Sequence, residues 1–155
     1  MKIIPYTDKY KEETIELIFD ILENEFGHHS KSGRPDLYNI TEEYQKNNGN
    51  FWLAVENENV VGTIALKNCD DGVGFLERMY VKKELRRVGL GTKLFSTLLT
   101  FAKNNNYKKI FLSTWEDTIS ANNFYIKNGF KRIESLPESI ANRSSSDNIF
   151  YKLEL

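Results

Sequence analysis

A turn that contains two glycines, residues 86–92 (RRVGLGT), lies between an apolar run that ends at Val81 and an amphipathic segment. This order predicts a turn that leads directly into the N-terminus of a helix. The first N–H groups of a helix have no acceptor within the helix, and the helix dipole places positive charge beside them. Gly89 and Gly91 have no side chains to keep a ligand from these N–H groups, and the two arginines add positive charge. The turn therefore predicts an anion-binding site.

The length and charge of the chain limit what such a site can serve. With 155 residues, we expect one domain over residues 1–155. The 21 basic and 22 acidic residues give a net charge of -1, which provides no overall attraction for nucleic acid or an anionic membrane. The single cysteine, Cys69, excludes an internal disulfide, and no apolar run of about 18 residues occurs. We expect a cytoplasmic protein with neither nucleic acid nor membrane as partner; homodimer formation stays open.

The N-terminal part predicts a short strand and two helices. Residues 2–6 are apolar enough for a strand, and apolar residues at three- and four-residue spacing predict a helix over residues 8–26. Residues 40–45 are expected to form a second, short helix. The polar segment between the helices contains His28 and His29. Adjacent histidines without a third ligand nearby are not expected to bind a metal, and lining a substrate pocket is the alternative role.

Three strands are predicted next. Residues 51–56 and 60–66 flank a polar turn and are rich in β-branched and aromatic residues, which predicts a hairpin, and residues 74–81 follow as a third antiparallel strand. In this strand a regular two-residue alternation would separate two sets of side chains. One face would carry Phe75, Glu77, Met79 and Val81, and the other Leu76, Arg78 and Tyr80. Glu77 would then share a face with apolar residues.

The C-terminal part predicts a parallel crossover and two final strands. A helical stripe over residues 94–102 is followed by an apolar run at 109–114, so strand, helix and strand predict a right-handed parallel connection. Residues 119–127 are expected to be helical, and Gly129 can adopt the positive φ that ends such a helix. Residues 130–134 and 149–155 are the last two predicted strands.

Two nucleotide-binding patterns do not match the turn. A Walker P-loop requires Gly-Lys-Ser or Gly-Lys-Thr, but Gly91 is followed by Thr92 and Lys93. A dinucleotide-binding fingerprint requires glycine or alanine where this chain has Leu94, and it follows the first strand of a parallel unit. The remaining interpretation combines the antiparallel strands, the turn, the helix and residues 121–130 (ANNFYIKNGF).

This combination resembles the GCN5-related N-acetyltransferase superfamily over nearly the whole chain. Residues 86–91 resemble its Gln/Arg-x-x-Gly-x-Gly/Ala turn, and residues 121–130 resemble its Ala-x-x-Phe-Tyr-x-Lys-x-Gly-Phe segment. The resemblance implies an α/β (α+β) fold with a mixed, mostly antiparallel central sheet of six to seven strands. It also implies helices on both faces and two strands that splay apart at the cofactor site.

The resemblance also implies how a cofactor would bind. The backbone N–H groups of the turn would bind the pyrophosphate of acetyl-CoA, and the backbone around Met79 and Val81 would pair with the pantetheine arm. Many members have asparagine where this chain has Thr118, which can still form a hydrogen bond. The implied cofactor-binding residues are Met79, Val81, Arg86, Arg87, Gly89, Leu90, Gly91, Thr92, Thr118 and Tyr125. No metal is expected.

Acetyl transfer to an amine requires two proton movements. An alkylamine with a pKa of about 10.4 is mostly protonated at neutral pH, so a base must take its proton. Glu77 is the candidate base because an apolar strand face would raise the pKa of its carboxyl; a structural ion pair or a surface carboxylate is the alternative. The resemblance places Tyr125 where a general acid commonly protonates the leaving thiolate, and a packed helix tyrosine is the alternative there.

The implied function is acetyl-CoA-dependent N-acetyl transfer to a primary amine of a small molecule or peptide by direct attack. The alternative is a non-catalytic acyl-CoA-binding or regulatory domain on the same fold. The acceptor site is expected between residues 25–38 and the loop before the last strand. This region contains His28, His29, Arg34 and Asp36, which select neither a cationic nor an anionic acceptor. A free amino acid, a small amine, an antibiotic amine and a protein terminus all stay open.

Overall fold

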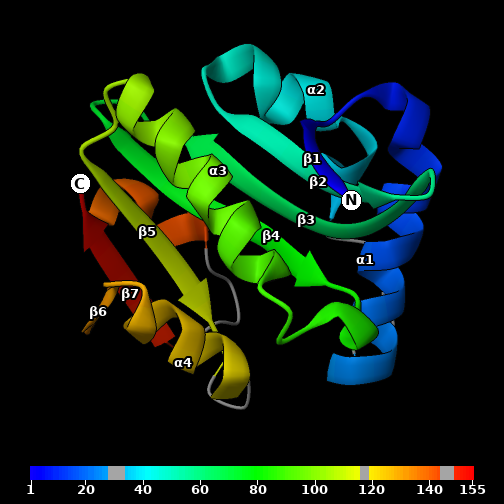
Figure 1. Ribbon diagram of the computed structural model, residues 1–155. Coiled ribbons are helices and arrows are strands. Elements are labelled where there is room, and N and C mark those ends of the chain that lie inside the picture. Colours follow the sequence, from blue (N-terminus) through cyan, green and yellow to red (C-terminus); the bar gives the residue numbers. More distant parts are fainter. Residues whose placement is uncertain (28–33, 116–118, 144–148) are drawn as a thin grey trace.

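The computed structural model describes residues 1–27, 34–115, 119–143 and 149–155. Its centre is a seven-stranded sheet in the order β1-β2-β3-β4-β5-β7-β6 (Figure 1). Among the strand pairs of these described residues, β4–β5 alone is parallel, so the predicted mixed, mostly antiparallel sheet is confirmed. The strands are β1 (Lys2–Pro5), β2 (Asn50–Glu56), β3 (Asn59–Asn68), β4 (Val73–Val81), β5 (Lys109–Thr114), β6 (Lys131–Ile133) and β7 (Ile149–Glu154).

Helices cover both faces of this sheet. The α-helices are α1 (Lys11–Phe26), α2 (Ile40–Glu43), α3 (Leu90–Asn104) and α4 (Ile119–Lys127). In Figure 1, α3 crosses one face and α1 lies on the other. Gly129, which follows α4, has a φ of 95°, as expected for a residue that ends a helix. Within the described ranges, the structure contains no helix that is both long and apolar enough to span a membrane.

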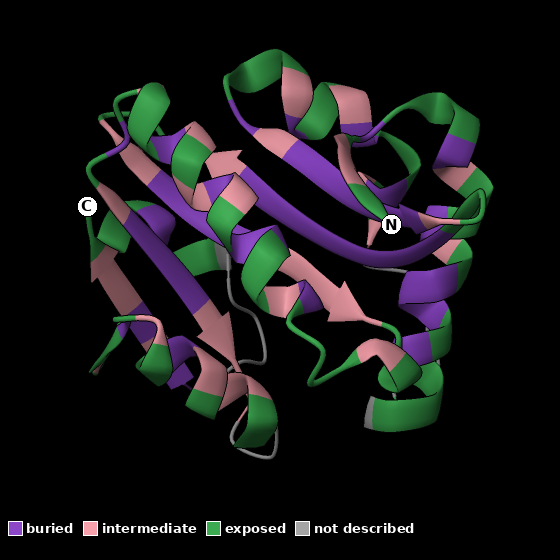
Figure 2. Cartoon of the chain, in the orientation of Figure 1, coloured by how far each residue is buried: buried purple, intermediate pink, exposed green. Residues whose placement is uncertain are grey.

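Alternation along β2 explains how one strand serves two cores. Phe51 and Leu53 belong to the buried cluster that includes α1, whereas Trp52 and Ala54 belong to the cluster that includes α3. Figure 2 shows the central strands buried along most of their length. Burying one such large apolar side chain stabilises the fold by about 2 kcal/mol. The sheet is therefore a rigid base from which β4 extends.

Strands β4 and β5 separate after a short parallel pairing. Their register joins Val73, Gly74 and Phe75 to residues 109–111. The rest of β4, residues 76–81, runs beside β3, where residues 76, 77, 80 and 81 pair, but has no strand partner on the β5 side within the described chain. This confirms the predicted splay, since over the described residues the edge of β4 on the β5 side has no neighbouring strand beyond Phe75.

A β-bulge in β4 corrects the predicted alternation. Thr63 pairs with Tyr80 and Ala65 pairs with Glu77, so two residues of β4 lie opposite Ile64 alone. One of the two, Arg78, has a positive φ of 54°. The prediction of a regular strand was therefore wrong beyond this point. Glu77, Arg78 and Tyr80 face the side of α1 and α2, whereas Leu76, Met79 and Val81 face α3.

Candidate active site at the open edge of strand β4

The glycine turn leads into α3 as the sequence predicts. Gly89 precedes the helix with a φ of 85°, and its carbonyl accepts a hydrogen bond from the amide of Lys93 at 3.0 Å. The side chain of Leu90 is buried in the core below and fixes the start of the helix. The amides of Leu90, Gly91 and Thr92 therefore have no acceptor within α3. This geometry can bind an anion through the backbone.

The two arginines of the turn have different surroundings. The guanidinium of Arg86 donates to both carboxylate oxygens of Glu25 on α1, at 2.5 and 2.8 Å. Its Nε also donates to the carbonyl of Val81 at 2.9 Å. Arg86 therefore connects the turn to α1 and to the end of β4, and the charge of its guanidinium is paired with a carboxylate. Arg87 is exposed and has a φ of 68°.

Three predicted parts of the cofactor site meet at Gly91. A Cβ atom added to Gly91 would lie 3.4 Å from Cε of Met79 on β4 and 3.7 Å from the ring of Phe124 on α4. The rings of Phe95 and Phe124 are 6.1 Å apart, which places α4 against α3. The start of α3, the open edge of β4 and the helix that carries Tyr125 are therefore neighbours.

Tyr125 is held in an aromatic cluster on the α3 side of the sheet. Its ring is 8% exposed and lies 5.8 Å from Phe124, 5.7 Å from Phe130 and 5.9 Å from Tyr151. These contacts fix the ring. They are what a packed helix tyrosine requires, and they also suit a general acid held in one orientation. Thr118 lies outside the described residues.

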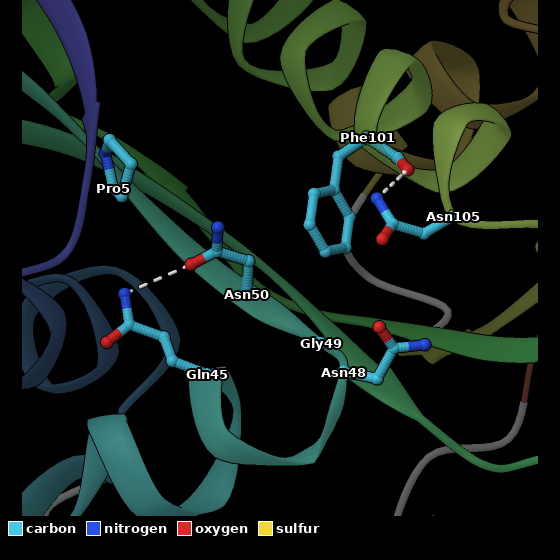
Figure 3. Close-up of a pocket in the computed structure, with 7 residues that line it drawn as sticks. All are labelled: Pro5, Gln45, Asn48, Gly49, Asn50, Phe101 and Asn105. Atoms are coloured by element: carbon cyan, nitrogen blue, oxygen red, sulfur yellow. Dashed lines mark hydrogen bonds between the residues drawn. The ribbon is translucent and has the colours of Figure 1, made fainter.

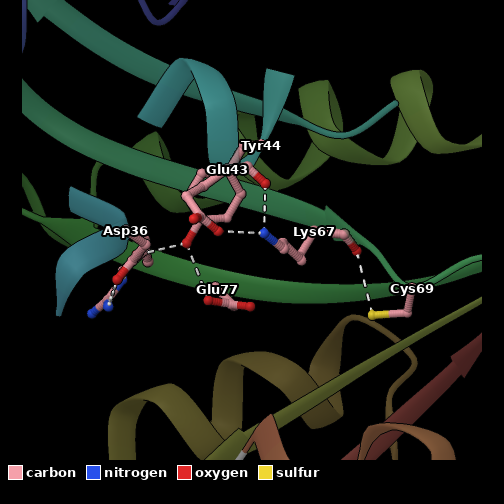
Figure 4. Close-up of polar contacts among 7 residues, drawn as sticks. Asp36, Glu43, Tyr44, Lys67, Cys69 and Glu77 are labelled. Atoms are coloured by element: carbon pink, nitrogen blue, oxygen red, sulfur yellow. Dashed lines mark hydrogen bonds and ion pairs between the residues drawn. The ribbon is translucent and has the colours of Figure 1, made fainter. Parts of the chain in front are cut away.

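Glu77 lies on the opposite side of the sheet, in a polar network. The hydroxyl oxygen of Tyr44 is 3.1 Å from Oε2 of Glu77 and 2.8 Å from Oδ2 of Asp36 (Figure 4). The guanidinium of Arg78 donates from Nε to Oδ2 of Asp36 at 2.9 Å and from Nη2 to Oδ1 at 2.8 Å. Glu77 therefore contacts a polar network. The predicted base and the predicted acid lie on opposite faces of the sheet.

The charges of this network stabilise each other. Burial would raise the pKa of the Asp36 carboxyl, but the hydrogen bonds and charge of Arg78, with the Tyr44 hydroxyl, outweigh it and lower that pKa below its ordinary value. Burial and the charges of Glu77 and Asp36 raise the pKa of Tyr44 well above its ordinary value. At neutral pH Asp36 is therefore ionised and Tyr44 keeps its proton.

The bulge is held in place by side chains that contact Arg78 and its backbone. A positive φ costs a residue with a Cβ atom about 1–2 kcal/mol. The hydroxyl of Thr63, which is fully buried, donates to the carbonyl of Arg78 at 2.7 Å. Asp36 holds the other end of the same residue through two hydrogen bonds. The side chain of Arg78 is thereby directed toward the region where the acceptor site is predicted.

Removing the Asp36 carboxylate should destabilise the fold in a pH-dependent way. The side chains of Asp36 and Arg78 are only 19% and 15% exposed, so Asp36→Asn leaves a largely buried guanidinium without its counter-charge. We expect a loss of about 3 kcal/mol at pH 7, measured by urea unfolding. Because the folded-state pKa of Asp36 is lowered, its contribution is present above the unfolded pKa of about 3.9. The contribution disappears as the pH falls through the lower, folded-state pKa.

An exposed ion pair provides the control for this measurement. Glu42 and Lys46 form an i,i+4 pair with side chains 64% and 63% exposed. Glu42→Gln should therefore change the unfolding free energy by at most about 0.5 kcal/mol. Equal losses in the two variants, or a difference between the native chain and Asp36→Asn that does not shrink as the pH is lowered, would contradict the prediction.

The other predicted features lie elsewhere. His28 and His29 are outside the described residues. Among the residues that the structure describes, no three His, Cys, Asp or Glu side chains gather into a metal site. A pocket between β1, β2 and α3 is lined by Pro5, Gln45, Asn48, Gly49, Asn50, Phe101 and Asn105 (Figure 3). It lies at the C-terminal end of α3, roughly 20 Å along the helix from the glycine turn, so it is separate from the candidate site.

Sequence reasoning did not identify Tyr44 as a residue of this site. Tyr44 follows α2, 33 positions before Glu77, and no motif joins the two segments. Asp36 was noted only as one of several polar residues of the acceptor region, and Arg78 was expected on the other face. The sequence signal that remained was weak: three polar or charged side chains in segments that flank the same sheet face.

Comparison with known proteins defines the class of protein. Residues 15–130 match the sequence profile of the Acetyltransferase (GNAT) family. This match covers more than half of the chain, which therefore belongs to that family. The resemblance seen in the two motifs is confirmed.

Individual relatives agree with this assignment. An acetyltransferase of the GNAT family from Staphylococcus aureus Mu50 is 41% identical, has a TM-score of 0.92, and the match covers 99% of this chain and 98% of that one. The probable N-acetyltransferase camello of Xenopus tropicalis is 31% identical, and the match covers 79% of this chain. The same match spans only 58% of the camello protein. A GNAT family acetyltransferase from Elizabethkingia anophelis, with acetyl-CoA bound, has a TM-score of 0.67. The match covers 99% of this chain and 97% of that one, and at 20% identity it concerns the fold alone.

Proposed function

We propose that this chain transfers the acetyl group of acetyl-CoA to a primary amine of a small molecule or peptide. The observation that carries the proposal is the open edge of β4, which runs from the end of the β5 pairing to the glycine turn at the start of α3. A long ligand with a thioester at one end and a pyrophosphate further along suits this edge and turn. Membership of the family and the acetyl-CoA in the Elizabethkingia anophelis structure support the same cofactor.

The cofactor would be held mainly by the backbone. The amides of Leu90, Gly91 and Thr92 are suited to the pyrophosphate, because they are the first of α3. The amide of Lys82 donates to Val61 on β3, and successive peptide groups of a strand point to alternate sides. The amide of Val81 therefore points toward the open side and is available to the pantetheine arm. The Val81 carbonyl already accepts from Arg86, so Met79 would supply the carbonyl acceptor.

Residues on the two faces of the sheet would perform the two proton transfers. A thioester in the gap would have Glu77 on the side of α1 and α2 and Tyr125 on the side of α3 and α4. The amine nitrogen would attack the carbonyl carbon, and its proton would pass to Glu77 directly or through water. Collapse of the tetrahedral intermediate would break the C–S bond and transfer the phenol proton of Tyr125 to the thiolate. The amine and the thiolate would thus occupy opposite sides of the sheet.

An acceptor screen tests this function. Thiol release from acetyl-CoA would be measured with amino acids, polyamines, an aminoglycoside and peptides with free N-termini, and mass detection would identify the acetylated product. We expect amine-dependent thiol release with at least one class. Tight acetyl-CoA binding without turnover of any amine would overturn the proposal and favour a non-catalytic acyl-CoA-binding domain.

The role of Tyr125 gives a separate prediction. Tyr125→Phe should lower kcat by about tenfold or more, because it removes the donor to the leaving thiolate and keeps the packed ring. The dissociation constant of acetyl-CoA, measured by calorimetry, should change by less than about twofold. Tyr151→Phe is the matched control, since its ring lies in the same cluster and its hydroxyl donates to Asn122 at 2.7 Å. An equal kcat in both variants would remove Tyr125 from the mechanism.

A further inference from the structure

One hydroxyl group connects two carboxylates on the acceptor side of the sheet. The oxygen of Tyr44 lies within hydrogen-bond distance of both Asp36 and Glu77, at 2.8 and 3.1 Å. A phenol has one hydrogen to donate. At any moment Tyr44 can therefore donate a hydrogen bond to only one of the two carboxylates. The second carboxyl group then faces the lone pairs of the Tyr44 hydroxyl oxygen.

Arg78 makes the two carboxylates different. The Arg78 guanidinium donates to both oxygens of Asp36, which keeps Asp36 ionised at neutral pH. Because Asp36 already accepts these hydrogen bonds, it depends less on a hydrogen bond from the Tyr44 hydroxyl. Glu77 instead receives its contact from the Tyr44 hydroxyl, at 3.1 Å. Tyr44 can donate to Glu77 while it is a carboxylate and can accept from Glu77 once it carries a proton.

The ring of Tyr44 is fixed, so its hydroxyl is fixed as well. Tyr44 is 1% exposed, and its ring packs edge-on against Phe51 at 5.4 Å between centroids. The ammonium group of Lys67 lies 5.3 Å from the ring centroid and donates to the carboxylate and the carbonyl of Glu43. Packing and these polar contacts hold the ring on both sides. Only the hydroxyl hydrogen can rotate between its two acceptors.

We propose that Tyr44 is a positioning residue that orients the Glu77 carboxyl during catalysis, donating a hydrogen bond to the ionised group and accepting one from the protonated group, while Arg78 holds Asp36 as the fixed end of the network. This inference rests on the proposed function, because it assigns Tyr44 to the support of the proposed base. The contacts join Tyr44, which directly follows α2, to β4 and to the segment Pro35–Tyr38, so the network also links the acceptor side to the bulge.

Tyr44→Phe tests the inference because it removes the hydroxyl and keeps the ring. With acetyl-CoA and the amine of the screen that gives the highest kcat, we expect kcat to fall about tenfold, with the KM for acetyl-CoA unchanged. Tyr6→Phe is the matched control. Tyr6 is 3% exposed, its ring also packs on Phe51, and its hydroxyl contacts the carboxylate of Asp8 at 3.1 Å. Equal kcat values for the two variants would overturn the inference.

A double-mutant cycle separates positioning from a general loss of stability. In a Glu77→Ala background, Tyr44→Phe should lower kcat by less than about twofold, because the group it orients is absent. Equal losses in both backgrounds would contradict the inference and leave the acetyltransferase function intact. If no amine is acetylated, the function fails, and urea unfolding of the same four proteins still tests the network. Additive changes in the unfolding midpoint would then show that Tyr44 and Glu77 are uncoupled.

Discussion

Glu77→Gln should lower kcat by a factor of about 100 or more, because general-base catalysis typically contributes a factor of that size. Glutamine has the shape of glutamate and can still accept a hydrogen bond from the Tyr44 hydroxyl, so the fold should be preserved. It cannot take a proton from an ammonium group. The KM for acetyl-CoA should stay within about twofold, since the backbone of β4 and the turn would hold the cofactor.

The decrease in kcat that Glu77→Gln causes should depend on the basicity of the acceptor amine. An acceptor of low basicity is already unprotonated at neutral pH and needs less help from a base, so Glu77→Gln should slow its acetylation less. Glu43→Gln is the control, because the Glu43 carboxylate pairs with Lys67 on the same side of the sheet and its link to Tyr44 passes through that lysine. A kcat for Glu77→Gln equal to that of Glu43→Gln would assign Glu77 a structural role.

Gly91→Ala should weaken acetyl-CoA binding by about tenfold or more and leave the fold at least as stable. The added Cβ would make ordinary contacts with Met79 and Phe124, at 3.4 and 3.7 Å, and alanine in a helix is favoured over glycine by about 0.5–1 kcal/mol. The same Cβ would occupy the meeting point of β4, α3 and α4, where the cofactor is proposed to pass. Loss of one hydrogen bond to the pyrophosphate would account for a tenfold change in the dissociation constant.

Gly89→Ala should instead lower the stability of the fold and leave acetyl-CoA binding nearly unchanged. A Cβ at Gly89 would meet no atom within 4 Å, but the φ of 85° strains a residue with a side chain by about 1 kcal/mol. Calorimetric titration with acetyl-CoA and urea unfolding of both variants separate access to the amides from backbone strain. An acetyl-CoA affinity that is unchanged in Gly91→Ala would remove the turn from the cofactor site.

Local patterns were sufficient to predict the framework of the fold. The β-branched and aromatic residues on both sides of a polar turn predicted the hairpin of β2 and β3, and the order of strand, helix and strand around the glycine turn predicted the parallel pairing of β4 with β5. These features depend on neighbours in sequence and on the restricted geometry of connections. The roles of Tyr125 and the turn in the site stay predictions, although the structure brings their elements together at Gly91.

Contacts between distant segments could not be predicted in the same way. The pairs Arg86–Glu25 and Arg78–Asp36 join residues that are 61 and 42 positions apart, and neither has a characteristic spacing. The bulge at Arg78 was missed because a two-residue period assumes that every position of a strand has a partner. No local signal marks Arg78, since an arginine is not a residue that commonly adopts a positive φ.

The bulge means that β4 contains one residue more than its pleat requires. If Arg78 were absent, Leu76, Met79 and Val81 would still face α3, and Glu77 and Tyr80 would still face α1. Arg78 can therefore be regarded as an inserted residue that does not change which side chains of β4 face α3 and which face α1. Such an insertion places an anionic and a cationic side chain next to each other in sequence and on the same side of the sheet. Regular pleating forbids this arrangement, so one extra residue places opposite charges next to each other on the α1 side of the sheet without any change to the hydrophobic core.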